Sequence, residues 1–256
     1  MKIILAGYGF VGKAVFNALK NKHNVVIVDP EVNTNKIRDY EDAEGIILCL
    51  PSPTNDNGVC DVNIITSVLD QVPTSMPVLI KSTVTPGIVE ALYGLYPDHK
   101  IVYNPEFLRA RTAEQDFLNQ KFIVLGGEDT DAFWQGVLQE ALPMCTLVFN
   151  CSAQEASLIK YSINSFLAVK TSFFNQINDI CELTGMDYSV VRQIISHDSR
   201  IGSDHTLVPG PDGERGWGGA CFPKDTAAFI QWATTIGTPQ TILEETVKYN
   251  RLIRTN

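Results

Sequence analysis

Short apolar runs alternate with amphipathic stretches over the first 150 residues of the chain. The runs are rich in Val, Ile and Leu, and several of the stretches between them place apolar residues at helical spacing. Strands that alternate with helices predict a doubly wound parallel sheet, because each helix returns the chain to the edge where the previous strand began. The predicted strands are Lys2–Ala6, Asn24–Val28, Gly45–Leu50, Pro77–Lys81, Lys100–Asn104, Lys121–Leu125 and Thr146–Phe149.

The pattern changes near Ala153, beyond which apolar residues recur at helical spacing until Gly185. This spacing predicts one helix of roughly 30 residues, longer than the usual 8–20, so we expect it to span a domain junction or a subunit interface. The helix has too many apolar positions for one of its faces to be exposed to solvent. We therefore expect it to form the interface of a homodimer. Further helices are predicted at Tyr188–Ser196, Lys224–Ile236 and Gln240–Arg254. The chain is therefore interpreted as an α/β domain over residues 1–150 and an all-α domain over residues 151–256.

A glycine pattern, Gly7-Tyr8-Gly9-Phe10-Val11-Gly12, follows the first predicted strand and opens a helix. The first glycine permits a tight turn, the second lets the backbone approach a pyrophosphate, and the third lets helix and sheet pack closely. Asp29 closes the second strand, where a carboxylate accepts hydrogen bonds from ribose hydroxyls and repels a 2′-phosphate. The pattern predicts a Rossmann-type domain that binds NAD rather than NADP; the alternative is a glycine-rich turn with a capping aspartate.

A cysteine ends a second glycine-rich loop, Gly216-Trp217-Gly218-Gly219-Ala220-Cys221. Pro223 suits the first turn of a helix, so the loop delivers Cys221 to a helix start. Unpaired amides and the positive end of the helix dipole stabilise a thiolate there, and Lys224 adds a nearby positive charge. The position predicts a nucleophilic thiol, whereas an isolated cysteine near a turn is more often unreactive.

Composition limits the possible partners. The chain carries 20 Lys and Arg against 29 Asp and Glu, a net charge of −9, which argues against binding to nucleic acid. At 45% hydrophobic and 19% charged residues it is typical of a globular protein with room for two modest domains. No apolar run approaches membrane-spanning length, and the strand at Lys2 leaves no room for a signal peptide, so no membrane partner is expected.

Cysteines and histidines give no sign of a disulfide framework or a metal site. The six cysteines contain no Cys-x-x-Cys pair, so we expect reduced thiols and a cytoplasmic location. The four histidines have no zinc-ligand spacing, and no metal is expected.

Four further blocks of sequence combine with the two glycine-rich loops into a recognisable order. They are Leu50-Pro51-Ser52-Pro53-Thr54, Lys81-Ser82-Thr83-Val84, Asn104-Pro105-Glu106-Phe107-Leu108-Arg109, and Lys160 with Asn164. In this order they resemble the UDP-glucose/GDP-mannose dehydrogenase family, and the resemblance covers nearly all of the chain. Members of that family oxidise the C6 primary alcohol of a nucleotide sugar twice, which gives a carboxylate and two NADH.

The resemblance implies how the second oxidation proceeds. Cys221 would attack the intermediate aldehyde to form a thiohemiacetal, and the next hydride transfer would leave a thioester for water to cleave. Lys160 and Asn164 lie four residues apart on one helix face and would stabilise the oxyanion at each stage. The alternative for this pair is a solvated helix face.

The remaining implied roles concern water and the cofactor. Glu106 would orient or deprotonate water through Thr83, and Asp225 would hold Lys160 or the water network. The residues implied in NAD binding are Gly7, Tyr8, Gly9, Phe10, Val11, Gly12, Asp29, Pro51 and Thr83.

Three features depart from the family pattern. A second acidic residue commonly follows the Glu-Phe-Leu block, but here Ala110 lies between two arginines, so one carboxylate is missing and hydrolysis is expected to be slower or differently assisted. The loop from Pro209 to Gly216 is longer than usual. The chain ends at Asn256, after a helix that in the family leads to a third domain for the nucleotide half of the substrate, so the resemblance implies a short form that lacks this domain.

Two other functions remain open at this stage. The related β-hydroxyacid dehydrogenases also join a Rossmann domain to a helical domain with a catalytic lysine, but a single oxidation needs no covalent thiol such as Cys221. A non-catalytic module that binds NAD and dimerises is the other alternative.

Overall fold

The computed structural model describes residues 1–55, 57–127, 131–142 and 147–254. The chain divides into two compact units. The first unit comprises Met1–Asn55 and Cys60–Lys160, and the second comprises Asp56–Val59 and Tyr161–Asn256. The division thus falls after Lys160, inside the long helix. The sequence analysis placed the boundary at residue 150, ahead of this helix.

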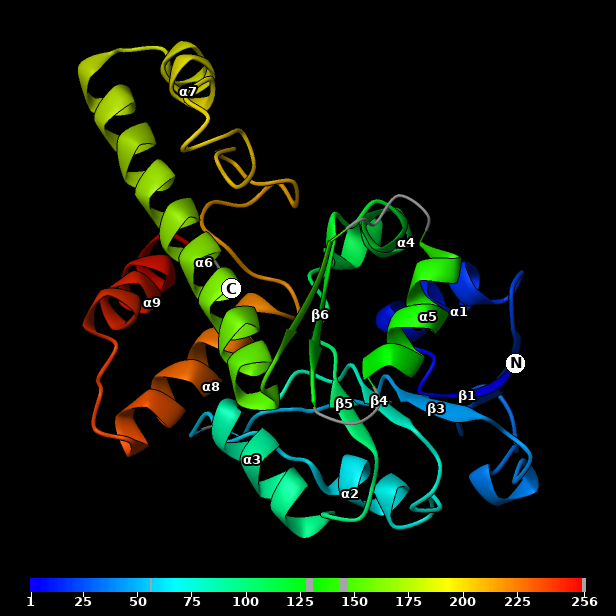
Figure 1. Ribbon diagram of the computed structural model, residues 1–256. Coiled ribbons are helices and arrows are strands. Elements are labelled where there is room, and N and C mark those ends of the chain that lie inside the picture. Colours follow the sequence, from blue (N-terminus) through cyan, green and yellow to red (C-terminus); the bar gives the residue numbers. More distant parts are fainter. Residues whose placement is uncertain (56, 128–130, 143–146, 255–256) are drawn as a thin grey trace. The chain divides into compact units, whose positions relative to one another are not determined.

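The first unit is built on a sheet of seven described strands in the order β2-β1-β3-β4-β5-β6-β7 (Figure 1). Neighbouring strands are parallel except β5 and β6, which run antiparallel and pair at Tyr103 and Gly126. The predicted α/β fold is confirmed, with a sheet that is mostly rather than wholly parallel. The strands are β1 (Lys2–Ala6), β2 (Asn24–Val28), β3 (Gly45–Leu48), β4 (Val78–Ile80), β5 (Ile101–Tyr103), β6 (Phe122–Gly126) and β7 (Leu147–Cys151).

Helices cover both faces of this sheet, which explains why its middle strands β3, β4 and β5 are apolar and buried at every position. Side chains alternate between the faces. Ile3 and Leu5 of β1 pack in one core with α1, α4 and α5, whereas Ile4 and Ala6 pack in another with α2 and α3. The helices of this unit are α1 (Phe10–Leu19), η1 (Ile37–Asp39), α2 (Asn63–Leu69), α3 (Pro86–Leu95), η2 (Ala110–Thr112), α4 (Ala113–Leu118) and α5 (Asp131–Ala141).

The predicted long helix is α6, Ala153–Thr184, of 32 residues (Figure 1). It begins with a capping box, since Ser152 and Glu155 each bind the other's backbone amide through their side chains. Its first turns belong to the first unit: Ala156 is buried in the core, and the Ser157 hydroxyl donates to the carbonyl of Val84 at 2.6 Å. This packing is why the boundary between the units lies after Lys160 rather than ahead of the helix.

In the described residues the second unit continues α6 and adds three shorter helices, which confirms the predicted helical segments. The α8 helix starts at Phe222, two residues before the predicted start, with Pro223 in its first turn. The rings of Tyr161 on α6 and Phe229 on α8 stack with centroids 5.9 Å apart. No helix in the described ranges has the length and apolarity to cross a membrane. The added helices are α7 (Tyr188–Ser196), α8 (Phe222–Thr235) and α9 (Thr241–Ile253).

Candidate functional site

The glycine loop between β1 and α1 has the shape of an anion cradle. Gly7 has φ +93°, and a Cβ there would overlap the carbonyl oxygen of Cys49. A Cβ on Gly12 would overlap the carbonyl of Gly7, so this glycine allows the close approach of helix and loop. Gly9, the N-cap of α1, has open space around it. The free amides of a helix start and the absence of a side chain fit the pyrophosphate of a dinucleotide.

Asp29 ties this loop to the end of β2. One carboxylate oxygen accepts the backbone N–H of Tyr8 at 2.6 Å, and the other accepts that of Glu31 at 2.8 Å. The carboxylate is partly exposed and so remains available to a ribose hydroxyl. Phe10 and Val11 pack against the core beneath the loop. These residues fit NAD.

We expect the protein to bind NAD at least about tenfold more tightly than NADP, a difference of about 1.4 kcal/mol, because Asp29 repels a 2′-phosphate. Replacing Asp29 by Asn removes the charge and should narrow this ratio. Binding titrations of both cofactors measure it. Glu31→Gln is the matched control, since it removes a neighbouring charge and leaves the ratio unchanged. Equal affinities of the wild-type protein for NAD and NADP would refute the assignment.

The carboxyl ends of β3 and β4 are tied together beside this loop. The Ser82 hydroxyl accepts the backbone N–H of Leu50 at 2.9 Å, and the Ser52 hydroxyl donates to the carbonyl of Thr83 at 2.6 Å. Pro51 is exposed between these two contacts. The contacts fix the loops that carry two of the residues implied in cofactor binding, Pro51 and Thr83.

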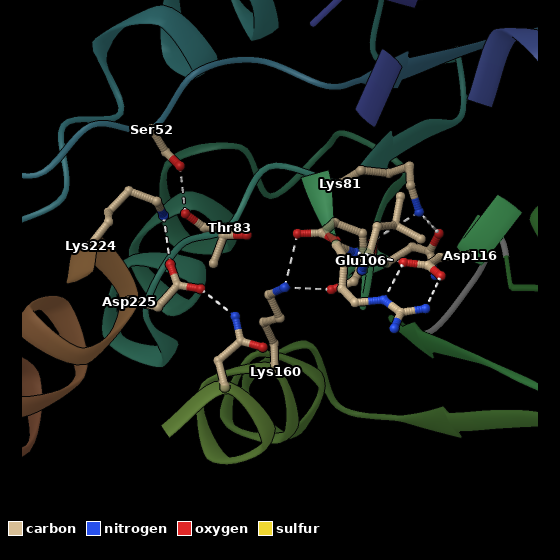
Figure 2. Close-up of polar contacts among 12 residues, drawn as sticks. Ser52, Lys81, Thr83, Glu106, Asp116, Lys160, Lys224 and Asp225 are labelled. Carbon is tan, nitrogen blue, oxygen red and sulfur yellow. Dashed lines mark hydrogen bonds and ion pairs between the residues drawn. The ribbon is translucent and has the colours of Figure 1, made fainter. Parts of the chain in front are cut away.

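A buried ion pair joins Lys160 of α6 to Glu106, which follows β5 (Figure 2). The Lys160 ammonium donates to the carboxylate of Glu106 at 2.8 Å and to its carbonyl at 2.6 Å. The second carboxylate oxygen accepts the backbone N–H of Leu108 at 2.6 Å. Both side chains are almost wholly buried, at 2% and 4% exposure. An ammonium has three N–H donors, so these two contacts leave a third for another oxygen.

Lys81 is a second buried lysine of this unit, and sequence reasoning assigned it no role. Its ammonium donates to the side-chain oxygen of Asn104 at 2.7 Å and lies 5.4 Å from the ring centre of Phe117. Burial lowers the pKa of Lys81 to about 8; the positive charge of Lys160 adds to this lowering, and the negative charge of Glu106 opposes it. The sequence signal is a charged residue at the end of an apolar run.

Lys81 should make the stability of the protein rise with pH between about 8 and 10.5. In this range the folded protein holds Lys81 neutral while the unfolded chain still binds its proton, so unfolding takes up a proton. Between these pH values, the free energy of unfolding of wild-type protein should rise by up to about 3 kcal/mol relative to that of Lys81→Met protein. Urea unfolding of both proteins at several pH values measures it. Lys100→Met, at an exposed lysine, should leave the pH dependence unchanged; the same result for Lys81→Met would contradict the prediction.

In the second unit, Asn164 and Asp225 form another buried contact. The Asn164 amide donates to the Asp225 carboxylate at 2.6 Å, and Lys224 forms an ion pair with the other oxygen at 2.8 Å (Figure 2). The sequence analysis expected Asp225 to hold Lys160 or water; its partners here are Asn164 and Lys224. Asn164 lies one turn beyond Lys160 on α6, so one helix carries a member of each buried pair.

Cys221 is the N-cap residue of α8, a helix of 14 residues, and is partly exposed. It lies at the start of the helix, as the sequence analysis placed it, where helix dipole and first-turn amides favour a thiolate. Cys49 contrasts with it: burial raises the pKa of the Cys49 thiol to about 12, which keeps that thiol protonated. Cys145 lies outside the described residues.

The segment that lacks the second acidic residue is held by a carboxylate from further along the chain. Asp116 of α4 accepts two N–H groups from the Arg109 side chain, at 2.6 and 3.0 Å, and the hydroxyl of Thr112 at 2.8 Å. The Arg109 guanidinium holds the pKa of Asp116 at about 2. This carboxylate is thus engaged in structure rather than replacing the missing one.

Sequence comparison places both units in one family. The NAD binding domain of the UDP-glucose/GDP-mannose dehydrogenase family matches residues 31–141, and the central domain of that family matches residues 154–252. The chain is 34% identical over 237 residues to the UDP-glucose 6-dehydrogenase AglM of Haloferax volcanii, covering 83% of this chain and 54% of the relative. It is 33% identical over 220 residues to YwqF of Bacillus subtilis, also a UDP-glucose 6-dehydrogenase, covering 81% and 48%. The chain spans about half the length of these relatives.

Solved structures show the same fold. A UDP-glucose dehydrogenase from Pyrobaculum islandicum matches 98% of this chain, and the match covers 68% of that protein with a TM-score of 0.82 and 25% identity. A 3-hydroxyisobutyrate dehydrogenase from Mycobacterium tuberculosis matches with a TM-score of 0.75 at 17% identity, covering 98% of this chain and 93% of that one. The second match shows the fold alone. The cofactor is NAD, and the chain belongs to the UDP-glucose/GDP-mannose dehydrogenase family.

Proposed function

We propose that the protein oxidises the C6 primary alcohol of a nucleotide sugar such as UDP-glucose to the carboxylate, with two NAD reduced per product. The observation that carries this proposal is Cys221 at the N-cap of α8, at the end of a glycine-rich loop. A cysteine in this position suits a four-electron oxidation, because it can retain the intermediate between the two oxidations. The relatives named UDP-glucose 6-dehydrogenase support the substrate class.

The proposed reaction has three stages. First, the alcohol loses a proton and a hydride and becomes the aldehyde. The Cys221 thiolate then adds to the aldehyde carbon, and loss of a second hydride from this thiohemiacetal leaves a thioester. Water finally adds to the thioester carbon, the C–S bond breaks, and the carboxylate and the thiolate are released. Bound NAD supplies the hydride acceptor at each oxidation.

The buried polar side chains described above would each have a role in this reaction. Lys160 would direct its third N–H at the oxygen that becomes negative when thiolate or water adds, and the Asn164 amide would assist it. Glu106 holds the Lys160 ammonium through their 2.8 Å ion pair and would orient the attacking water through Thr83. Asp225 fixes the Asn164 amide through their 2.6 Å hydrogen bond.

One assay tests the proposal directly: NADH yield with a panel of UDP-, GDP- and other nucleotide sugars, with sugar phosphates and small hydroxy acids as controls. Two NADH per carboxylate formed from a nucleotide sugar is the expected result. One NADH per carbonyl product, or turnover of hydroxy acids only, would favour the two-electron dehydrogenase of the β-hydroxyacid type that the sequence left open. Retained NAD binding with no NADH from any substrate would identify a non-catalytic module.

We further propose that the protein is a homodimer built on α6. Phe166, Phe173 and Ile180 are spaced seven residues apart and are 63%, 54% and 53% exposed, so they form an apolar stripe on one helix face. The partner we propose for the stripe is the same helix of a second copy, because a twofold interface buries identical surfaces.

Introducing charge into this stripe should dissociate the dimer. The double variant Phe166→Glu/Phe173→Glu is expected to be a monomer at micromolar concentration, because four buried carboxylates at the interface would face one another without partners. Light scattering gives the mass. Leu95→Glu, at an exposed leucine of α3, is the matched control and should stay dimeric. A wild-type monomer, or a double variant with unchanged mass, would count against the proposal.

A further inference from the structure

The loop that leads to Cys221 is bound by a side chain of α9. The Asn250 side-chain oxygen accepts the backbone N–H of Trp217 at 2.8 Å, and its NH₂ group donates to the carbonyl of the same residue at 2.9 Å. One amide side chain thus pairs with both backbone groups of Trp217, as a neighbouring strand would. Asn250 is buried, with 7% exposure, so these bonds are shielded from water.

A second amide binds the loop from α6. The Asn175 side-chain oxygen accepts the backbone N–H of Gly216 at 3.1 Å, and Asn175 is wholly buried. The indole N–H of Trp217 donates to the hydroxyl of Ser172 at 2.9 Å. The loop is therefore held from two helices just before the residues that deliver the cysteine.

Gly216 is required by this arrangement. Its φ is +70°, and a Cβ at this position would overlap the side-chain oxygen of Asn250. Gly213 in the same loop also has positive φ, +84°, but a Cβ there would meet nothing within 4 Å. The two glycines share a backbone conformation and differ in contact with Asn250, which provides a matched pair for experiment.

The segment from Pro209 to Arg215, which precedes the loop, is bound by residues at the C-terminal end of α9. Arg254, which follows α9, donates to the Asp212 carboxylate at 2.6 Å and to the carbonyl of Arg215 at 3.2 Å. The Arg215 side chain pairs with Asp179 of α6, whose other oxygen accepts the hydroxyl of Tyr249 at 2.8 Å. The segment that departs from the family pattern thus extends the same attachment to α6 and α9.

We propose that Asn250 is a positioning residue for Cys221: by fixing the backbone of Trp217 it sets where the following four residues deliver the thiol at the start of α8. The inference rests on the nucleophilic role of Cys221 under the proposed function. The mechanism acts through geometry, since the helix dipole and the amides of the first turn favour a thiolate only at the start of α8. Charged or titratable groups near this segment include Lys224 and Asp225 on α8, the His205 ring against Phe222, and the Arg254 guanidinium beside Gly218. None of them changes in the variants below.

The test is the rate at which iodoacetamide alkylates Cys221 as a function of pH, with the site identified by mass spectrometry. In wild-type protein the midpoint should lie below the free-thiol value of about 8.5. Asn250→Ala and Gly216→Ala should both shift it towards that value and lower kcat, with unchanged affinity for NAD. Asn250→Asp retains the acceptor for the Trp217 amide, so its midpoint should move less from the wild-type value than that of Asn250→Ala.

Matched controls separate positioning from loss of stability. Gly213→Ala strains the same kind of backbone without touching Asn250, and Lys248→Ala removes an exposed side chain of α9; neither should move the midpoint. An unchanged midpoint in Asn250→Ala protein, or an equal shift in Gly213→Ala, overturns the inference alone. A wild-type midpoint at the free-thiol value overturns it together with the role of Cys221. Shifts as expected without NADH production from nucleotide sugars would leave the inference standing and sink the proposed function.

Discussion

Protein with Cys221 replaced by Ala should form no carboxylic acid from a nucleotide sugar and should bind NAD as tightly as wild-type protein. Without the thiol no thioester can form, whereas the glycine loop and Asp29 lie in the other unit and are untouched. The measurements are product analysis by mass spectrometry, NADH counted per product, and an NAD titration.

Cysteines elsewhere provide the control for this variant. Cys49→Ala removes a thiol that burial keeps protonated, and Cys181→Ala removes a buried thiol of α6, so both proteins should still make the acid. Acid formation by Cys221→Ala protein at the wild-type rate would disprove the thioester route. A product that stops at the carbonyl in wild-type protein would instead favour the simpler dehydrogenase.

Replacing Lys160 by Met should destabilise the first unit by about 3–5 kcal/mol, because it leaves the Glu106 carboxylate buried without its counter-charge. Turnover should also be lost, since the proposed oxyanion donor is removed. Urea unfolding gives the free energy, and the NADH assay gives the activity. The expected loss is large because both side chains are almost fully buried.

A second variant distinguishes loss of charge balance from loss of packing. The double variant Lys160→Met/Glu106→Gln removes both charges and should recover much of the stability but none of the activity. Lys248→Met removes an ion pair with Glu245 in which both side chains are 65% exposed, and it should leave the unfolding free energy nearly unchanged. A Lys160→Met protein as stable as the Lys248→Met protein would show that the buried pair is not needed for folding.

The elements were predictable where their signals are local in the sequence. The strands have continuous apolar runs because helices cover both faces of the sheet, and the first glycine loop is defined by consecutive residues around Gly9. The long helix was visible in its periodicity. Its division between two units was not, because only packing shows that the Ser157 hydroxyl binds the carbonyl of Val84.

Contacts between segments that are distant in sequence could not be predicted from the sequence pattern. Lys81 is the clearest case, since nothing near it in sequence shows that Asn104 accepts its hydrogen bond. The same holds for Asn250, an ordinary polar residue of an amphipathic helix until Trp217 is seen beside it. The resemblance named Asp225 as a site residue, but its contact with Asn164 required the fold.

The sharing of α6 between the two units sets the limit at which the protein can be dissected. A fragment cut at residue 150 would lose Ala156 from its apolar core. It would also lose Lys160, the charged side chain that pairs with the Glu106 carboxylate in the described residues. A fragment of the first unit that keeps these contacts therefore extends at least through Lys160. Because α6 continues without a break past Lys160, proteolytic nicking at that boundary requires the helix itself to unwind.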